Sequence, residues 1–182
     1  MHPLVDQVRK AGVVGAGGAG FPAHIKYNTQ ADILLANGAE CEPLLFKDKE
    51  LMRVFGEEVT KGMELVAQAV GASRSILGIK AKNKEVIGQF HRLFGATRHE
   101  IFEMGDYYPA GDEYVLVYEA TGRLIPYGGY PVNIGCVVSN VETLVNVALA
   151  ALDVPVTEKF LTITGAVRTP MTLKVPIGTP VS

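Results

Sequence analysis

The sequence predicts an α/β protein in which a mostly parallel sheet is covered by helices. Short runs that are apolar on both faces alternate with longer segments whose apolar residues recur every three or four positions. With 182 residues, 48% of them hydrophobic, the chain is long enough for one or two domains with a real core. Its 17 basic and 19 acidic residues form no basic block, which argues against nucleic acid or an anionic membrane as a partner.

The N-terminal part predicts a helix, a glycine-rich loop and a strand. A short helix is expected over residues 1–10. The stretch from Gly12 to Tyr27, GVVGAGGAGFPAHIKY, has five glycines within nine residues, and Pro22 can then open a brief helix. Such a loop lets a phosphate or a flat ring lie on the main chain, and a tight connection without a ligand is the alternative. Asp32 to Ala36, DILLA, is typical of a buried parallel strand.

Two helix–strand pairs are expected next. Asp48 to Val70 predicts one helix, with Asp48 as its N-cap and a glycine at its end. Ser75 to Ala81 predicts a second strand, Lys84 to Phe94 a second helix, and His99 to Met104 a third strand.

The next segments predict another helix, strand and helix. Asp112 to Gly122 fits a strand or a helix, and the helix is favoured because a glycine ends it. Ile134 to Val138 predicts a short buried strand. Ser139 to Glu142 matches the capping box S-x-x-E, and the helix after it is expected to bury an apolar face that reaches Leu152.

The C-terminal tail, from Lys159 onward, has a different sequence pattern from the segments before it. Phe160 to Thr164 and Met171 to Val175 predict two strands around a turn. Because a lone two-stranded ribbon is marginal in water, the tail is expected to be the opening of a domain that is cut short.

Cysteine content and hydropathy narrow the setting. Cys41 and Cys136 lie far apart, which argues against a disulfide framework, a CxxC metal site or an iron–sulfur cluster held by four thiolates of this chain. A reduced, cytoplasmic setting fits best. The N-terminus does not resemble a signal peptide, and prolines and glycines interrupt the longest uncharged run, Leu124 to Val141, so no membrane span is expected.

Four sequence blocks follow one another between residues 12 and 145: GAGGAGFPAHIKY, NGAECEPLLFKDK, YPAGDE and SNVETL. In that order they resemble the blocks GxGGxGFPxxxK, E-P-x-x-F-K-D, Y-x-x-G-E-E and N-N-V-E-T of the NADH-binding flavoprotein subunit family of respiratory complex I. The residues of these blocks are most similar to the branch of the family that contains the C component of Rnf-type electron-transport complexes and the cobalamin reductases of propanediol utilisation.

The resemblance implies a fold and an activity. Residues 1–153 would form a Rossmann-like domain that binds FMN and NADH, and residues 154–182 would begin a β-grasp, soluble-ligand-binding-type domain. The implied activity is that of an FMN-dependent oxidoreductase, an NADH dehydrogenase, in which hydride passes from NADH to the flavin and electrons then leave to iron–sulfur clusters. The alternative is a non-catalytic nucleotide-binding or scaffold module of an electron-transport complex.

Partners are implied as well. The 4Fe-4S segment of full-length family members has no counterpart here, so the chain is expected to be an incomplete N-terminal fragment that passes electrons to another domain or subunit. A cytoplasmic position, or one peripheral to a membrane complex without insertion, is expected. The cut tail could also complete its sheet in a homo-oligomer.

The first block supplies several implied cofactor contacts. Phe21 would stack on the nicotinamide or adenine, and Lys26 would contact the FMN phosphate or ribityl chain, where a cation suits a phosphate. Lys26 could instead be a solvated helix residue. The glycines that would let FMN and NADH approach the backbone are Gly15, Gly17, Gly18 and Gly20.

The second and third blocks supply an amide and four acids. Asn37 would hydrogen-bond the flavin edge, and Glu40 and Glu42 would lie near the flavin and NADH. Asp112 and Glu113 would contact hydroxyl groups of the two ligands. The glutamates Glu40 and Glu42 could also be exposed loop acids, and Asp112 could be only an N-cap.

The fourth block would meet the FMN phosphate through Asn140 and Thr143, at the start of the capped helix. Ser139 and Glu142 are explained by capping alone. No catalytic acid–base residue and no metal ligand is implied. Ala16 and Ala39 depart from the complex I pattern, which has an Arg and an acid there, and this affects the NADH contacts more than the FMN site.

Overall fold

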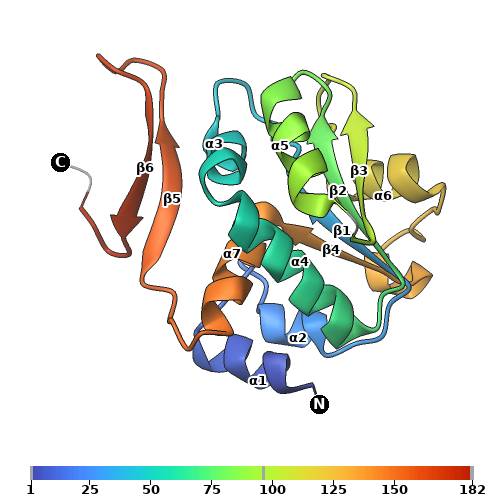
Figure 1. The fold of residues 1–182 in the computed structure, drawn as a ribbon. Coiled ribbons are helices and arrows are strands. Elements are labelled where there is room, and N and C mark those ends of the chain that lie inside the picture. The colour runs from blue at the N-terminus through green and yellow to red at the C-terminus, as the bar shows by residue number, and fades with distance from the viewer. Residues whose placement is uncertain (1, 96, 181–182) are drawn as a thin grey trace.

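The computed structural model describes residues 2–95 and 97–180. Its main sheet has four parallel strands in the order β3-β2-β1-β4 (Figure 1). The strands are β1 Ile33–Asn37, β2 Arg74–Lys80, β3 His99–Met104 and β4 Cys136–Asn140. The parallel, helix-covered sheet predicted from the alternation of apolar patterns is therefore confirmed.

Helices cover both faces of this sheet. On the larger face lie α1 Pro3–Lys10, α2 Ala23–Tyr27, α3 Lys47–Val54, α4 Gly56–Val70, α5 Lys84–Phe94 and α7 Val141–Ala150. The other face carries α6 Glu113–Thr121 and the short 3₁₀ helix η1 Pro131–Ile134. Side chains alternate along each strand, so Leu34 and Ala36 enter one core while Ile33 and Leu35 enter the other.

The single helix expected from Asp48 to Val70 is wrong in one respect, because the chain breaks at Phe55 into α3 and α4. Gln89 of α5 donates to the carbonyl oxygens of Met52 and Arg53 at 3.5 and 3.2 Å, which satisfies the last turn of α3 from outside. Asp48 is not an N-cap: it lies within α3 and is buried. The end of α4 at Gly71, which is left-handed with φ 74°, is as predicted.

The capping box at the start of α7 is also wrong, by one residue. Strand β4 runs on to Asn140, and Asn140 caps the helix by accepting from the backbone N–H of Glu142 at 2.9 Å. Ser139 still belongs to the strand, and Glu142 is buried in an ion-pair cluster. Leu152 lies beyond the helix and is exposed.

Other local predictions are confirmed. The segment after Asp112 is the helix α6, with Asp112 as its N-cap and Gly122 at its end. The expected N-terminal helix is present as α1, and it buries Val5 and Val8.

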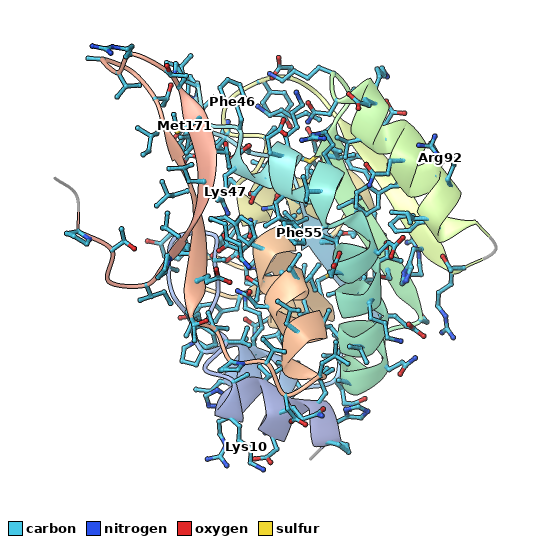
Figure 2. All side chains as sticks on the ribbon, turned by 60° about the vertical axis from the view of Figure 1, so that its left-hand side comes forward. Lys10, Phe46, Lys47, Phe55, Arg92 and Met171 are labelled. Carbon is cyan, nitrogen blue, oxygen red and sulfur yellow. The ribbon has the colours of Figure 1, made fainter. Side chains whose placement is uncertain are left out.

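The tail forms an antiparallel ribbon of β5 Glu158–Ile163 and β6 Met171–Pro176 beside the main body (Figure 1). Phe160 anchors it by packing edge-on against Phe55, with ring centroids 5.3 Å apart. Figure 2 shows Lys47 and Phe55 on the side of the body that faces the ribbon. A domain boundary near residue 153 and a β-grasp continuation stay predictions.

Across the described ranges 2–95 and 97–180, no helix is both long enough and apolar enough to cross a membrane. The same residues hold no group of three or more acidic, histidine or cysteine side chains arranged for a metal ion.

Candidate functional site

A cleft of about 390 Å³ opens where β1 and β4 end, a volume within the usual range for ligand pockets. After β1 the chain builds β2 and β3 on one side, and then β4 on the other. The strand order thus reverses between β1 and β4. In open α/β sheets, ligands bind at the carboxyl ends of the strands at such a switch point.

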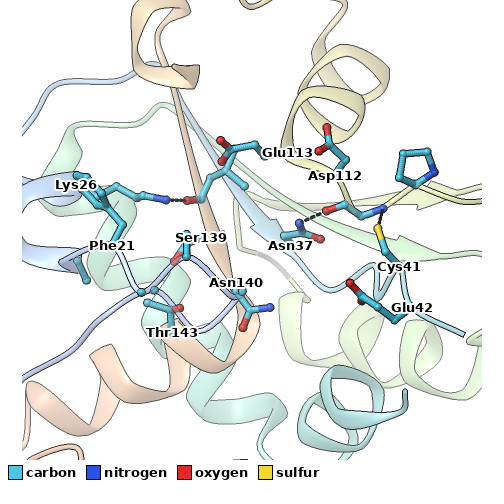
Figure 3. Close-up of a pocket in the computed structure, with 18 of the residues that line it drawn as sticks. Phe21, Lys26, Asn37, Cys41, Glu42, Asp112, Glu113, Ser139, Asn140 and Thr143 are labelled. Carbon is cyan, nitrogen blue, oxygen red and sulfur yellow. Dashed lines mark hydrogen bonds between the residues drawn. The ribbon is translucent and has the colours of Figure 1, made fainter. Parts of the chain in front are cut away.

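Segments far apart in the sequence meet at this cleft. Asn37 and Asn140 end the two strands and are partners in register. Most of the predicted site residues line the cleft: Gly15, Gly17, Gly20, Phe21, Lys26, Asn37, Glu42, Asp112, Glu113, Asn140 and Thr143 (Figure 3). Gly18 and Glu40 do not line it.

The glycine-rich loop forms one wall. A bridge between Val14 and Pro22 closes its base, and the N–H of Ala16 donates to Thr143 Oγ1 at 2.9 Å, which ties the loop to α7. Gly18 and Gly20 have φ of 118° and 64°, which residues other than glycine rarely adopt. Gly17 has no such φ, and a Cβ there would make only an ordinary contact with Asn140 Cβ at 3.6 Å. The fold therefore does not require glycine at position 17, and its missing side chain leaves this part of the cleft wall open.

Lys26 reaches into the cleft from α2 and donates from Nζ to the carbonyl oxygen of Val138 at 3.0 Å. Burial lowers the pKa of this amine, and the nearby charge of Glu113 acts in the opposite direction. The ring of Phe21 lies beside it, with its centroid 6.0 Å from Nζ. The structure thus places Lys26 in the cleft rather than on a solvated helix face.

The opposite wall of the cleft is held by two hydrogen bonds to the backbone of Gly111. Asn37 Nδ2 donates to the Gly111 carbonyl oxygen at 2.8 Å, and the Gly111 N–H donates to Cys41 Sγ at 3.0 Å (Figure 3). A Cβ on Gly111 would lie 1.7 Å from the Ala39 oxygen, so only glycine allows this approach. Burial raises the pKa of the Cys41 thiol, which disfavours the nucleophilic thiolate.

The predicted acids differ in their surroundings. Asp112 caps α6 through the N–H of Tyr114 at 2.9 Å, and it also faces the cleft. Glu40 instead accepts from the N–H of Asp48 at 3.1 Å, at the start of α3. Burial raises the pKa of Glu40, and the neighbouring Asp48 raises it further.

Two hydroxyl groups at the floor of the cleft were not among the predicted site residues. Tyr27 and Ser139 are both buried, and their oxygens lie 2.7 Å apart. The pair has two protons and one shared hydrogen bond, so one hydroxyl proton remains for a ligand. Burial raises the pKa of Tyr27 to about 12, which keeps its proton in place at neutral pH. Ser139 could have been suspected as a polar residue at a strand end, whereas Tyr27 carries no local signal.

Residues 8–149 match the Nuo51 FMN-binding domain family, which covers the glycine loop, both strand ends and the start of α7. The chain belongs to this family. The resemblance of the four blocks to the complex I flavoprotein is therefore confirmed.

Two relatives support the same family assignment. The cobalamin reductase PduS of Citrobacter freundii is 45% identical over 95% of this chain and 38% of its own length. The C component of the Na⁺-translocating ferredoxin:NAD⁺ oxidoreductase complex of Acetobacterium woodii is 36% identical over 97% of this chain and 42% of its own length. The chain thus spans about two fifths of these relatives. The predicted branch of the family is confirmed.

A solved structure has a similar fold. An NAD⁺-reducing [NiFe]-hydrogenase in the H₂-reduced state matches 97% of this chain and 37% of its own chain, with a TM-score of 0.82 and 29% identity. The relatives are oxidoreductases or subunits of oxidoreductase complexes. The family that matches this chain is described as an FMN-binding domain.

Proposed function

We propose that this chain binds FMN in the cleft between β1 and β4 and takes part in the FMN-dependent oxidation of NADH. The observation that carries the proposal is the convergence of residues from all four sequence blocks on one cleft at the switch point of the sheet. NADH as the electron donor rests on the resemblance and on a hydrogenase relative that reduces NAD⁺.

The residues present fit a flavin mononucleotide. Bare backbone at Gly17 is not demanded by the protein's own packing, but it would let a flat ring or a phosphate lie against the main chain. The N-terminus of α7, with Asn140 and Thr143, suits a phosphate, and Lys26 supplies a cation at the same cleft. Asn37 would hold the flavin edge.

FMN, when bound, would supply two-electron acceptance from NADH and one-electron release. The chain's own residues would bind and orient the ligands and exclude water. Phe21 would stack on NADH, and Asp112, Glu113 and Glu42 would meet hydroxyl or amide groups. No proton-transfer residue is needed, because a hydride carries its proton together with the electron pair.

Electrons would leave to iron–sulfur clusters of another domain or subunit. Relatives that are parts of Rnf-type complexes support such partners and a position peripheral to a membrane complex. The β5–β6 ribbon would begin the β-grasp domain that follows at residues 154–182.

An anaerobic titration tests the proposal. Adding FMN to the purified chain should quench flavin fluorescence with saturation at one equivalent, and adding NADH should then bleach the flavin absorbance. Riboflavin, which lacks the phosphate, should bind more weakly. A chain without affinity for FMN would contradict the cofactor assignment.

A second function, a non-catalytic flavin- or nucleotide-binding module, is favoured by two residues in the first two blocks. Ala16 and Ala39 stand where the complex I pattern has an Arg and an acid, and both alanines have their N–H groups bonded within the protein. FMN binding without bleaching by NADH would support this second function against the first.

A further inference from the structure

A cluster of buried charges joins the ribbon to the start of α7. Glu142, the second residue of α7, is 1% exposed. Its Oε1 lies 2.7 Å from Lys159 Nζ of β5, and its Oε2 lies 2.7 Å from Lys47 Nζ of α3. The backbone N–H of Phe160 also donates to Oε1, at 3.4 Å. The carboxylate therefore holds the ribbon to the helix directly.

The same cluster continues into the cleft. Lys47 Nζ lies 2.7 Å from Asp48 Oδ1, and Asp48 Oδ2 accepts from Asn140 Nδ2 at 2.8 Å. The other atom of that amide, Asn140 Oδ1, accepts from the N–H of Glu142. Both ends of the Asn140 amide are thus fixed, and Asn140 lines the cleft. A chain of contacts runs from Lys159 in the ribbon to a residue of the proposed cofactor site.

Charge balance in this cluster has a consequence for an anionic ligand. Two lysines face two acids in these ion pairs, and Glu40, which accepts from the N–H of Asp48, lies beside them. Removal of Lys159 would make this group one charge more negative at the N-terminus of α7, where the helix dipole otherwise favours a phosphate. Because Glu142 is buried, water would screen that charge poorly.

We propose that the ribbon is an electrostatic part of the cofactor cleft. Lys159 balances the charge of Glu142 at the start of α7 and, through Lys47 and Asp48, keeps Asn140 in place, so that the cleft accepts a phosphate-bearing ligand best when the ribbon is docked. This inference rests on the proposed FMN binding. Lys159 and Asp48 are positioning residues, since they act through Asn140 and the helix terminus.

The test compares Lys159→Met with Lys174→Met. Both variants remove one lysine charge from the same ribbon. Lys174 pairs with Glu158 of the neighbouring strand, and its Nζ lies 5.8 Å from the Phe160 ring centroid, whereas Lys159 pairs with Glu142 of α7. Lys159→Met should raise the dissociation constant for FMN about threefold to tenfold, the range expected for a charge near a helix terminus. Riboflavin affinity should change less, since riboflavin has no phosphate. Lys159→Arg should restore FMN affinity, and Lys174→Met should retain it.

A second measurement does not depend on flavin. In the ligand-free protein, hydrogen–deuterium exchange over residues 46–48 and 140–143 should rise in Lys159→Met and not in Lys174→Met. Equal FMN selectivity over riboflavin in both methionine variants would overturn the electrostatic role. Unchanged exchange would overturn the mechanical link. Failure of the wild type to bind FMN would contradict the proposed function. The exchange measurement would still show whether Lys159 stabilises the start of α7.

Discussion

Lys26 is a cleft residue whose burial lowers the stability of the folded chain, and its proposed role is to bind a ligand phosphate. Its ammonium group loses much of its water on folding, and the carbonyl oxygen of Val138 at 3.0 Å replaces only part of it. The folded protein therefore binds this proton less tightly than the unfolded chain does. The cost is fully present at neutral pH and disappears as the pH rises toward the ordinary value of 10.5.

We expect Lys26→Met to bind FMN more weakly by about 1–3 kcal/mol, the scale of a charge-assisted hydrogen bond. The melting temperature of the ligand-free variant should equal or exceed that of the wild type, because a buried charge is removed. This advantage should shrink as the pH approaches 10.5. Flavin titration and thermal melts at several pH values measure both effects.

Lys61→Met is the matched control, since Lys61 pairs with Glu64 on the exposed side of α4. It should leave FMN affinity unchanged. An unchanged FMN affinity in Lys26→Met would remove Lys26 from the site.

At the scale of elements, the cleft depends on how closely α7 packs on α4. A Cβ on Gly62 would lie 2.1 Å from the backbone oxygen of Leu144, so the two helices touch through bare backbone. Asn140 caps α7 and Thr143 lies in its first turn, and both line the cleft, so a shift of α7 would move two residues of the candidate site.

Gly62→Ala should therefore lower the free energy of unfolding by about 1–3 kcal/mol, the usual cost of overpacking, and weaken FMN binding as α7 shifts. Gly88→Ala in α5 is the control, because the nearest atom to a Cβ there is Arg92 Nη1 at 3.9 Å. It should stabilise the protein by up to about 1 kcal/mol through helix propensity. Urea unfolding measures both variants, and an equal response would contradict the packing argument.

At the scale of the whole molecule, a four-stranded body and a two-stranded ribbon share a small junction. The junction includes the rings of Phe55 and Phe160, the Glu142 ion pairs and the hydrogen bond from the N–H of Val156 to the Ala11 oxygen. Two strands alone are marginally stable, so the ribbon depends on these contacts. It should open more readily than the body.

Phe160→Ala should speed hydrogen exchange of the β5 and β6 amides and leave the amides of β1 and β2 protected. The buried aromatic ring is the main apolar contact of the ribbon, whereas Ile163 of the same strand is 40% exposed. Ile163→Ala should have little effect. Faster exchange throughout the main sheet would mean that body and ribbon unfold as one unit and would contradict a boundary near residue 153.

The order of strands and helices and the grouping of the four blocks could be predicted from the sequence. The order of the elements depends on short-range patterns, because apolar periodicity marks each strand and helix. The site residues followed from the resemblance of the four blocks to the flavoprotein family. Asn37, Asp112 and Asn140 do line one cleft, and their contacts with FMN stay predictions.

The tertiary structure alone decided the rest. Lys47 and Glu142 are 95 residues apart in the chain, and Tyr27 and Ser139 are 112 residues apart. Pairs at such separations produce no periodic pattern in the sequence. Local capping rules misplaced Asp48 and Ser139 because both side chains bond to distant partners instead: Asp48 to Asn140, and Ser139 to Tyr27. The glycine-rich loop alone left a ligand site and a tight connection both open, and the charge pairing at the start of α7 depends on long-range contacts, which only the folded chain brings together.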